Sequence, residues 1–493
     1  AYAYDTQGNM TEKGTYSSAD TRTSRKRWSY QHSSFPGRLW KEINFDDTYT
    51  EYSYDGAGNI DSVTDPRTYT TLYEYDALNR LEAVTQQGNI LTEYNYDLHG
   101  NLTAVTDANG NTTTFLYDDM GRVVVNTSPD TGITTYAFDE VGNVVQKIDA
   151  RGITVQYLYD DLNRLTDVNF PDASENIIYS YDAGVYAKGR RTGMLDQTGS
   201  STFGYDPRGR LTAKTSIIYG VAYTVSRSYT PGERLEEVVY PTGRSIDYSR
   251  HPNGKIEGVT TTFNSVTDVL FNNTVFNPFG KAGGMTSGSG STVNNQTSEC
   301  DCLEVANPGA PMETIYSYDA NRNLTSVRAA NAPWLDRDYT YDPLNRLANA
   351  DGAFGSYAFT YDDVGNRLTS TENGQSKTYS YIPGTNRIEA VTAGSQTVGY
   401  VDDPNGNIAG IGDRVLKYNQ NNRLIRVEEN TNVLGEYLYN GLGQRVTKTV
   451  EGVETLFHYD FDGKIIGESA PDGTFSKEYL YTSYTPKALS LIH

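Results

Sequence analysis

The residues best suited to acid–base or metal chemistry are few and scattered. None of the five histidines lies in a metal-binding motif or a nucleophile-activating motif, and we interpret each as a surface or turn residue. They are His32, His99, His251, His458 and His493. The only two cysteines, Cys300 and Cys302, are separated by one residue, which strains a disulfide and leaves too few ligands for a metal. The sequence therefore predicts no catalytic residue, no cofactor and no metal site, and a protein that is not an enzyme.

Carboxylates and amides are the one recurring polar pattern, as in Asp55-Gly56-Ala57-Gly58-Asn59. Oxygen-rich loops of this kind can bind calcium, but Ca²⁺ takes about 6–8 oxygen ligands. Each loop offers one Asp and one Asn, so we interpret the pattern as turn capping. The Asp carboxylate can accept a hydrogen bond from a backbone N–H two residues further on, and Gly or Asn tolerates the positive φ that such turns need.

A fixed spacing of aromatic residues shows what these turns connect. Tyrosine accounts for 41 residues, against 15 Phe and 3 Trp. An aromatic–x–aromatic–Asp pattern recurs every 21 residues, with the second aromatic at Tyr54, Tyr75, Tyr96, Tyr117, Phe138 and Tyr159. The pattern returns in the C-terminal half at Tyr318, Tyr341 and Tyr361 and continues to Tyr481. A period of 20–50 residues indicates a repeat architecture.

Each repeat predicts one β-hairpin. Aromatics at i and i+2 share one face of a strand, Asp begins the turn, and an alternating strand such as Leu102–Thr106 returns. No helical periodicity is present, so we expect an all-β fold in which the tyrosines of successive hairpins form a ladder. The predicted structural signature comprises Tyr54, Asp55, Gly58, Asn59, Tyr75, Asp76, Tyr96, Asp97, Gly100, Asn101, Tyr117, Asp118, Gly121, Tyr159, Asp160, Tyr318, Asp319, Tyr341, Asp342, Tyr361, Asp362, Gly365 and Asn366.

These units resemble the YD repeat of bacterial Rhs toxins, teneurins and the BC component of toxin complexes. The resemblance predicts a β-shell over residues 1–282, with an irregular segment at 20–50, and again over 313–493. Residues 283–312 are rich in Gly, Ser and Asn and predict an inserted loop. The chain opens inside a repeat and stops before the Rhs-associated core, so we expect a fragment that lacks the toxin.

The number of strands has a geometric consequence. About 20 hairpins give roughly 40 strands and a sheet about 190 Å wide, at ~4.8 Å per strand. Twisted sheets of that width must curl. One closed turn about 60 Å across leaves a lumen of about 40 Å, enough for a small domain of about 130 residues. The predicted fold is one long curled sheet that forms a hollow shell or spiral cocoon, although a tube or stacked sheets would use the same strands.

Composition and resemblance together narrow the function. The formal net charge of −21 argues against nucleic-acid binding, and no apolar run is long enough to span a membrane. The resemblance implies a secreted or cell-surface bacterial protein whose partners are a C-terminal toxin passenger and the secretion machinery. We therefore expect a structural shell that encapsulates and helps deliver that toxin. The alternative is an adhesive scaffold that binds carbohydrates or cell-surface proteins through exposed tyrosine rings.

Overall fold

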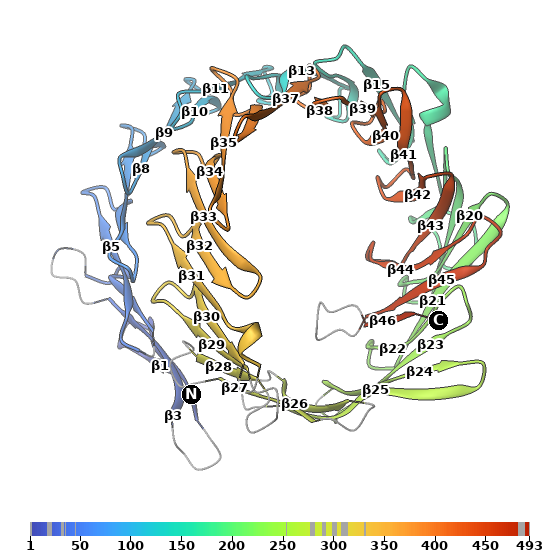
Figure 1. Cartoon of the computed structure of the whole chain (residues 1–493), viewed down its shortest axis with the longest axis horizontal. Coiled ribbons are helices and arrows are strands. Elements are labelled where there is room, and N and C mark those ends of the chain that lie inside the picture. Colours follow the sequence, from blue (N-terminus) through green and yellow to red (C-terminus); the bar gives the residue numbers. More distant parts are fainter. Residues whose placement is uncertain are drawn as a thin grey trace. The chain divides into compact units, whose positions relative to one another are not determined.

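The computed structural model describes residues 2–16, 22–30, 34, 36–44, 46–252, 254–276, 282–287, 292–297, 303–306, 314–329, 332–481 and 489–492. These residues form 46 β-strands and two short 3₁₀ helices, η1 (Ala173–Glu175) and η2 (Pro333–Leu335), with no α-helix among them. The predicted all-β fold is confirmed. Figure 1 shows the strands as a succession of neighbouring hairpins.

The strands of the N-terminal half are β1 (Tyr2–Tyr4), β2 (Met10–Tyr16), β3 (Arg22–Ser29), β4 (Lys41–Ile43), β5 (Tyr49–Tyr54), β6 (Ile60–Thr64), β7 (Thr70–Tyr75), β8 (Leu81–Gln86), β9 (Ile90–Tyr96), β10 (Leu102–Thr106), β11 (Thr112–Tyr117), β12 (Val123–Ser128), β13 (Gly132–Phe138), β14 (Val144–Ile148), β15 (Thr154–Tyr159), β16 (Leu165–Asn169), β17 (Ile177–Tyr181), β18 (Arg191–Asp196), β19 (Gly199–Tyr205), β20 (Leu211–Ile218), β21 (Val221–Tyr229), β22 (Leu235–Val239), β23 (Ser245–Arg250), β24 (Ile256–Phe263) and β25 (Val266–Phe276).

Those of the C-terminal half are β26 (Ala282–Ser287), β27 (Thr292–Thr297), β28 (Leu303–Ala306), β29 (Thr314–Tyr318), β30 (Leu324–Ala329), β31 (Arg337–Tyr341), β32 (Leu347–Gly352), β33 (Gly355–Tyr361), β34 (Arg367–Glu372), β35 (Gln375–Tyr381), β36 (Ile388–Ala393), β37 (Gln396–Asp402), β38 (Ile408–Ile411), β39 (Arg414–Tyr418), β40 (Leu424–Glu429), β41 (Asn432–Tyr439), β42 (Arg445–Val450), β43 (Val453–Tyr459), β44 (Ile465–Ser469), β45 (Phe475–Leu480) and β46 (Leu489–Ile492).

Strands that follow one another in sequence pair antiparallel, so the sheet is a meander of hairpins. In the hairpin of β15 and β16, Tyr157 pairs with Val168 and Tyr159 pairs with Leu165. The register shifts by one residue immediately before Tyr159, and the same shift precedes Tyr54 and Tyr341 in their hairpins. The extra residue, Thr166 in this hairpin, lies in the return strand, which the bulge bends and twists opposite the aromatic. The position of the second aromatic is therefore fixed by a bulge as well as by alternation.

The chain divides into two compact units and runs through each of them twice. Unit 1 comprises residues 1–116 and 273–398, and unit 2 comprises 117–272 and 399–493. We call residues 1–272 the first pass and residues 273–493 the second pass. Each unit thus contains a run of hairpins from each pass.

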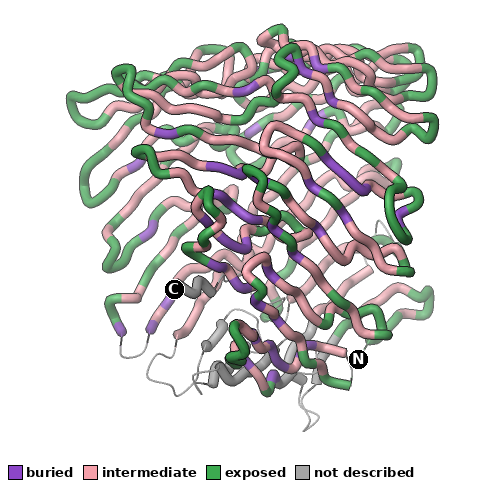
Figure 2. The backbone as a smooth tube through the Cα atoms, turned by 90° about the vertical axis from the view of Figure 1, so that its right-hand side faces the viewer, coloured by how far each residue is buried: buried purple, intermediate pink, exposed green. Residues whose placement is uncertain are grey.

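The burial of side chains differs along the chain. Figure 2 shows most exposed residues at the hairpin turns. A buried cluster within the first pass of unit 2 comprises Val155, Val168, Phe170, Ile177, Met194 and Phe203. A second cluster joins Ile218 and Tyr223 of the first pass to Val446 and Leu456 of the second. In unit 2 apolar packing therefore helps to hold the two passes together.

The structure differs from the sequence prediction in two segments. Strands β3 and β4 lie within residues 20–50, where the sequence predicts an irregular segment. Strands β26, β27 and β28 occupy the described part of residues 283–312, where the composition predicts a loop. A strand is held by backbone hydrogen bonds and does not require apolar side chains, so polar Thr- and Asn-rich sequences continue the meander. Residues 298–302, which include both cysteines, lie outside the described residues.

Candidate functional site: the seam between the two passes

The turn that follows each Tyr-Asp pair, which we call a YD turn, is closed by its aspartate. Asp97 Oδ1 accepts hydrogen bonds from the backbone N–H groups of His99 (2.9 Å) and Asn101 (2.8 Å), and Oδ2 accepts one from Asn101 Nδ2 (2.9 Å). The hydrogen bond from the Asn101 side chain is the main reason that the pKa of Asp97 is lowered. Where the fifth residue is Arg, its Nε replaces the amide, as between Arg80 and Asp76 (2.7 Å). The carboxylate oxygens are thus engaged in turn capping.

The predicted signature residues all lie in such turns or at the strand ends before them. The aspartates that accept turn hydrogen bonds are Asp55, Asp76, Asp97, Asp118, Asp160, Asp319, Asp342 and Asp362. Gly58, Gly100, Gly121 and Gly365 have φ between 75° and 97°. Asn59, Asn101 and Asn366 each donate through Nδ2 to the capping aspartate. Tyr75, Tyr117 and Tyr318 end β7, β11 and β29.

The tyrosine ladder is built from hydroxyl-to-backbone contacts. The Tyr96 hydroxyl donates to the carbonyl of Leu81 (2.9 Å), which begins the return strand of the preceding hairpin. The Tyr159 hydroxyl donates to the Val144 carbonyl (3.0 Å) in the same way. Equivalent bonds are made by Tyr54, Tyr341 and Tyr361. Each of these rings therefore attaches its hairpin to the one before it.

The side chain of the fifth residue of a YD turn also joins successive hairpins, because it contacts the next YD turn along the chain. Arg80 Nη1 donates to the carbonyl of Asp97 in the next YD turn (2.9 Å), and its guanidinium lies 4.7 Å from the Tyr96 ring centre. Where Asn replaces Arg, an amide pair forms instead, as between Asn59 Nδ2 and Asn79 Oδ1 (3.0 Å). The guanidinium covers one face of the ring, which favours the ladder over sugar stacking as the role of these tyrosines.

The turns at the opposite ends of the hairpins, which we call return turns, join the first pass to the second. In unit 1, Asp107 Oδ1 caps its own return turn by accepting from the N–H groups of Asn109 and Asn111. Its Oδ2 accepts a hydrogen bond from Asn386 Nδ2 of the second pass (2.7 Å). Asn386 Oδ1 in turn accepts from Asn366 Nδ2 (3.1 Å). One carboxylate therefore closes a turn and holds the neighbouring pass.

The same device recurs at a second position in unit 1. Asp65 Oδ1 accepts from the N–H of Arg67 (2.9 Å), and Asp65 Oδ2 accepts from Asn321 Nδ2 of the second pass (2.5 Å). The Arg67 guanidinium also crosses, donating to Asn345 Oδ1 (2.9 Å). These contacts between the passes are polar, and the two second-pass residues, Asn321 and Asn345, both lie in YD turns.

In unit 2 the seam is more deeply buried. Asp149 is 9% exposed, and its Oδ2 accepts from Asn405 Nδ2 of the second pass (2.7 Å). Arg151 pairs with Asp149 (2.8 Å) and donates to the carbonyls of Asn419 (2.9 Å) and Gln420 (3.0 Å). Burial alone would raise the pKa of Asp149, but the hydrogen bonds from Arg151 and Asn405 outweigh it and lower that pKa.

The seam is absent from the fold predicted from the sequence, although the sequence contains a signal for it. Asp65, Asp107 and Asp149 are spaced by 42 residues, which is twice the repeat period. Each begins a five-residue return turn, whereas other return turns, such as Glu372–Gln375, are tight two-residue connections. A search for this double period, rather than for the YD motif, would have identified the seam aspartates.

Asp149 provides a test of the seam. Asp149→Asn keeps one oxygen to cap the turn, but it removes the charge and the second oxygen that hold Asn405 and Arg151. We expect a loss of about 2 kcal/mol in the free energy of unfolding, in the range for hydrogen bonds to charged groups. Asp118→Asn is the matched control because Asp118 caps its turn and pairs with Arg122 within one pass. Urea unfolding followed by circular dichroism should separate the two variants; equal losses would contradict the account.

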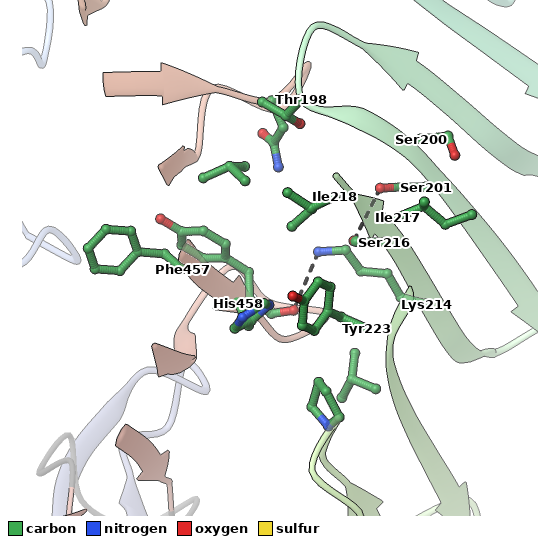
Figure 3. A pocket seen from close by; sticks show the side chains of 15 residues that line it. Thr198, Ser200, Ser201, Lys214, Ser216, Ile217, Ile218, Tyr223, Phe457 and His458 are labelled. Atoms are coloured by element: carbon green, nitrogen blue, oxygen red, sulfur yellow. Dashed lines mark hydrogen bonds between the residues drawn. The ribbon is translucent and has the colours of Figure 1, made fainter. Parts of the chain in front are cut away.

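A cluster of buried titratable side chains lies in unit 2, where β20 and β21 meet β43 and β44. It includes His458, which is buried within β43, so the interpretation of this histidine as a surface or turn residue is wrong. Lys214 Nζ donates to the carbonyl of Tyr459 (3.5 Å; Figure 3). His458 Nε2 is 2.8 Å from Ser469 Oγ. Burial lowers the pKa of Lys214, and burial lowers the pKa of His458 to about 4. The pocket beside them has about 20 Å³ of free space, room for about one water molecule. This space is too small for an organic substrate.

His458 predicts how stability changes with pH. Its folded-state pKa of about 4 lies below the ordinary value of 6.5, so the unfolded chain binds a proton first as the pH falls. Stability present above pH 6.5 should therefore be lost between pH 6.5 and 4, by up to about 3 kcal/mol. The aspartates with lowered pKa act in the same direction. Half-buried Asp460, whose pKa is raised mainly by burial, has the opposite effect on stability.

The measurement compares wild type with His458→Phe, which keeps the ring contacts to Tyr223 and Phe475. Urea unfolding at pH 7 and pH 4.5 should show a smaller pH effect in the variant than in wild type. An identical pH effect in both proteins would mean that His458 is protonated in the folded state.

Metal-ligand clusters and membrane-spanning helices are both absent from the described residues. Among the residues that the structure describes, no group of three or more His, Cys, Asp or Glu side chains is arranged to hold a metal ion. The described part of the chain also has no helix with the length and apolar character of a membrane span.

Comparison with known proteins agrees with this repeat geometry. The family model of the teneurin YD-shell matches residues 66–202. The chain is 30% identical over 148 residues to the tRNA nuclease WapA of Bacillus subtilis, a match that covers 29% of this chain and 6% of that protein. A second WapA, the tRNA3(Ser)-specific nuclease of Bacillus spizizenii, is 29% identical over 148 residues with the same coverage.

Solved structures match the whole chain. The crystal structure of TcdB2-TccC3 superposes with a TM-score of 0.76 and 15% identity, covering 100% of this chain and 33% of that one. The Tc holotoxin pore of Photorhabdus luminescens gives a TM-score of 0.67 and 13% identity, covering 100% of this chain and 34% of that one. This chain therefore spans about a third of the solved chains. The matched family model and the shared fold show that this chain is similar to YD-repeat shell proteins.

Proposed function

We propose that this chain is a stretch of β-shell wall that encloses a toxic passenger domain and helps to deliver it. The observation that carries the proposal is the seam. An ordinary meander leaves its hairpin turns free, but here Asp107 and Asp149 fasten return turns of the first pass to turns of the second pass, through Asn386 and Asn405. Turns fastened in this way join the hairpins of the two passes within each unit, which an enclosing wall needs and an adhesive surface does not.

The comparisons support the proposal at the level of fold. One solved structure with the same fold is described as a Tc holotoxin pore, and another as TcdB2-TccC3 without its hypervariable C-terminal region. The passenger, the secretion machinery and a secreted location belong to the proposal for this chain. A non-catalytic role is also proposed, because the buried His458 and Lys214 side chains are placed for packing and not beside a substrate-sized space.

Protease protection tests the proposal. A small passenger domain, unfolded by substitution so that it is readily cleaved, is fused after His493 of the full chain. We expect cleavage of the passenger at least tenfold slower than in the same passenger fused to an unrelated soluble domain. The triple seam variant Asp65→Asn, Asp107→Asn, Asp149→Asn should restore fast cleavage. A passenger cleaved at the same rate in both fusions would overturn the proposal.

A further inference from the structure

One edge of unit 2 exposes apolar residues at regular intervals. The YD turns after β11, β13 and β15 carry Met120, Val141 and Leu162 at the same turn position. Their exposed fractions are 71%, 69% and 69%. In the second pass of the same unit, Leu442 occupies the equivalent position and is 41% exposed. The first-pass turns thus form an open edge.

The lower exposed fraction of Leu442, compared with Met120, Val141 and Leu162, follows from its position at the seam. The second-pass turn that carries Leu442 is held by the first pass, since Gly441 N–H donates to Asp196 Oδ2 (2.7 Å) and the Tyr179 hydroxyl donates to the Gly441 carbonyl. The YD turns of the first pass lie at the other end of their hairpins, away from the seam. Their apolar side chains are therefore not needed to join the two passes.

Each exposed apolar residue has an acidic neighbour. Asp119 precedes Met120, Glu140 precedes Val141 and Asp161 precedes Leu162, and all three carboxylates are exposed. We call these six residues the acidic–apolar rim. The doublet occurs in three consecutive YD turns only here, and the next regular turn of unit 2 carries Pro207 and Arg208; in unit 1 the doublet occurs in a single turn, at Asp363 and Val364. A local row of this kind is typical of an interaction surface rather than of repeat composition.

The rim is also rigid. Asp118, Asp139 and Asp160 close the three turns with backbone hydrogen bonds. Arg122 donates to the Asp139 carbonyl (3.3 Å), and Asn143 Nδ2 donates to Asn163 Oδ1 (3.1 Å), so each turn is tied to the next. A partner would lose little free energy in ordering such a surface.

Spacing determines the kind of partner that fits. Successive YD turns are two strands apart, or about 9.6 Å at ~4.8 Å per strand. Residues seven apart in an α-helix share one face and lie about 10.5 Å apart. In an extended strand, residues on one face recur at about 6.6 or 13 Å, which does not match. The row therefore fits an apolar heptad stripe on a helix of about 15–21 residues, and its carboxylates fit flanking Lys or Arg.

We propose that the acidic–apolar rim is a docking surface for a basic amphipathic helix of a partner protein. In this arrangement three apolar helix residues, one from each heptad, pack against Met120, Val141 and Leu162 respectively. Basic side chains on either side of that stripe reach Asp119, Glu140 and Asp161. This role is independent of whether the shell encloses a passenger.

A labelled synthetic helix of three heptads tests the proposal with the full chain. It carries Leu once per heptad and flanking Lys on an Ala-rich background, and its scrambled version has the same composition and charge. Fluorescence anisotropy in low salt should show the heptad peptide binding at least tenfold more tightly than the scrambled one. Equal binding of the two would reflect only attraction to an acidic protein and would overturn the proposal.

Variants locate the site. Met120→Ser, Val141→Ser, Leu162→Ser together should weaken binding at least tenfold, and Asp119→Asn, Glu140→Gln, Asp161→Asn together at least fivefold. The control combines Leu195→Ser, Val266→Ser and Val453→Ser, which are exposed apolar residues of unit 2 outside the three rim turns. Unchanged binding in the rim variants, or self-association that they abolish, would overturn the assignment, the latter in favour of a second copy. Circular dichroism verifies that each variant is folded.

Discussion

Glu478→Ala is expected to lower the free energy of unfolding by about 3–5 kcal/mol, the range for removal of one partner from a buried ion pair. Glu478 lies in β45 of the second pass, and its Oε2 is 2.6 Å from Arg244 Nε of the first pass. The two side chains are only 4% and 3% exposed. Thr242 Oγ1 also donates to Glu478. Alanine would leave the buried guanidinium without this carboxylate, which is far more costly than losing a surface pair.

A double variant separates the ion pair from simple packing. Arg244→Met combined with Glu478→Leu removes both charges and keeps the buried volume, so we expect stability close to that of wild type. Urea unfolding of the four proteins in this cycle gives the coupling free energy directly. A double variant as unstable as the sum of the single variants would show that the two residues act independently and that the seam is not held by this pair.

Tyr159→Ala is expected to cost about 3 kcal/mol, because the half-buried ring packs on the preceding hairpin and its hydroxyl donates to the Val144 carbonyl. Tyr159→Phe removes only the hydroxyl and should cost about 1 kcal/mol. Leu158→Ala is the matched control, since Leu158 is adjacent, points to the opposite face and is 50% exposed. Urea unfolding measures all three. A Tyr159→Ala protein as stable as wild type would mean that the ring is available for binding, as the adhesive alternative requires.

The local repeat could be predicted from the sequence because its determinants are local. Asp97 and Asn101 belong to one turn, and the 21-residue period of residues such as Tyr96 is visible without any structure. The aspartate–N–H contact two residues on, the left-handed glycine and the all-β fold all follow from such short-range rules. The number of strands was underestimated, because polar segments with weak patterns, such as Thr292–Thr297, also join the sheet.

The seam could not be predicted because it depends on which turns the fold brings together. Asn386 is 279 residues from Asp107, and no local pattern in Asn386 distinguishes a seam amide from an ordinary turn amide. The same holds for Arg244 and Glu478, which look like surface charges in the sequence and are buried only where the two passes meet. The tyrosine ladder was predicted as side chains in register, whereas the structure attaches each ring to a backbone carbonyl of the preceding hairpin.

Small-angle X-ray scattering from the full chain tests the central claim, that these repeats form a wall around an enclosed space. A compact globule of this chain length has a radius of gyration of about 23 Å. A shell keeps its mass away from the centre, so we expect a radius clearly above that of the compact globule and a pair-distance distribution shifted toward long distances relative to a solid sphere. A radius of gyration equal to that of the compact globule, with the scattering profile of a solid particle, would contradict the account. The hairpins joined at the seam would then be stacked sheets without a lumen.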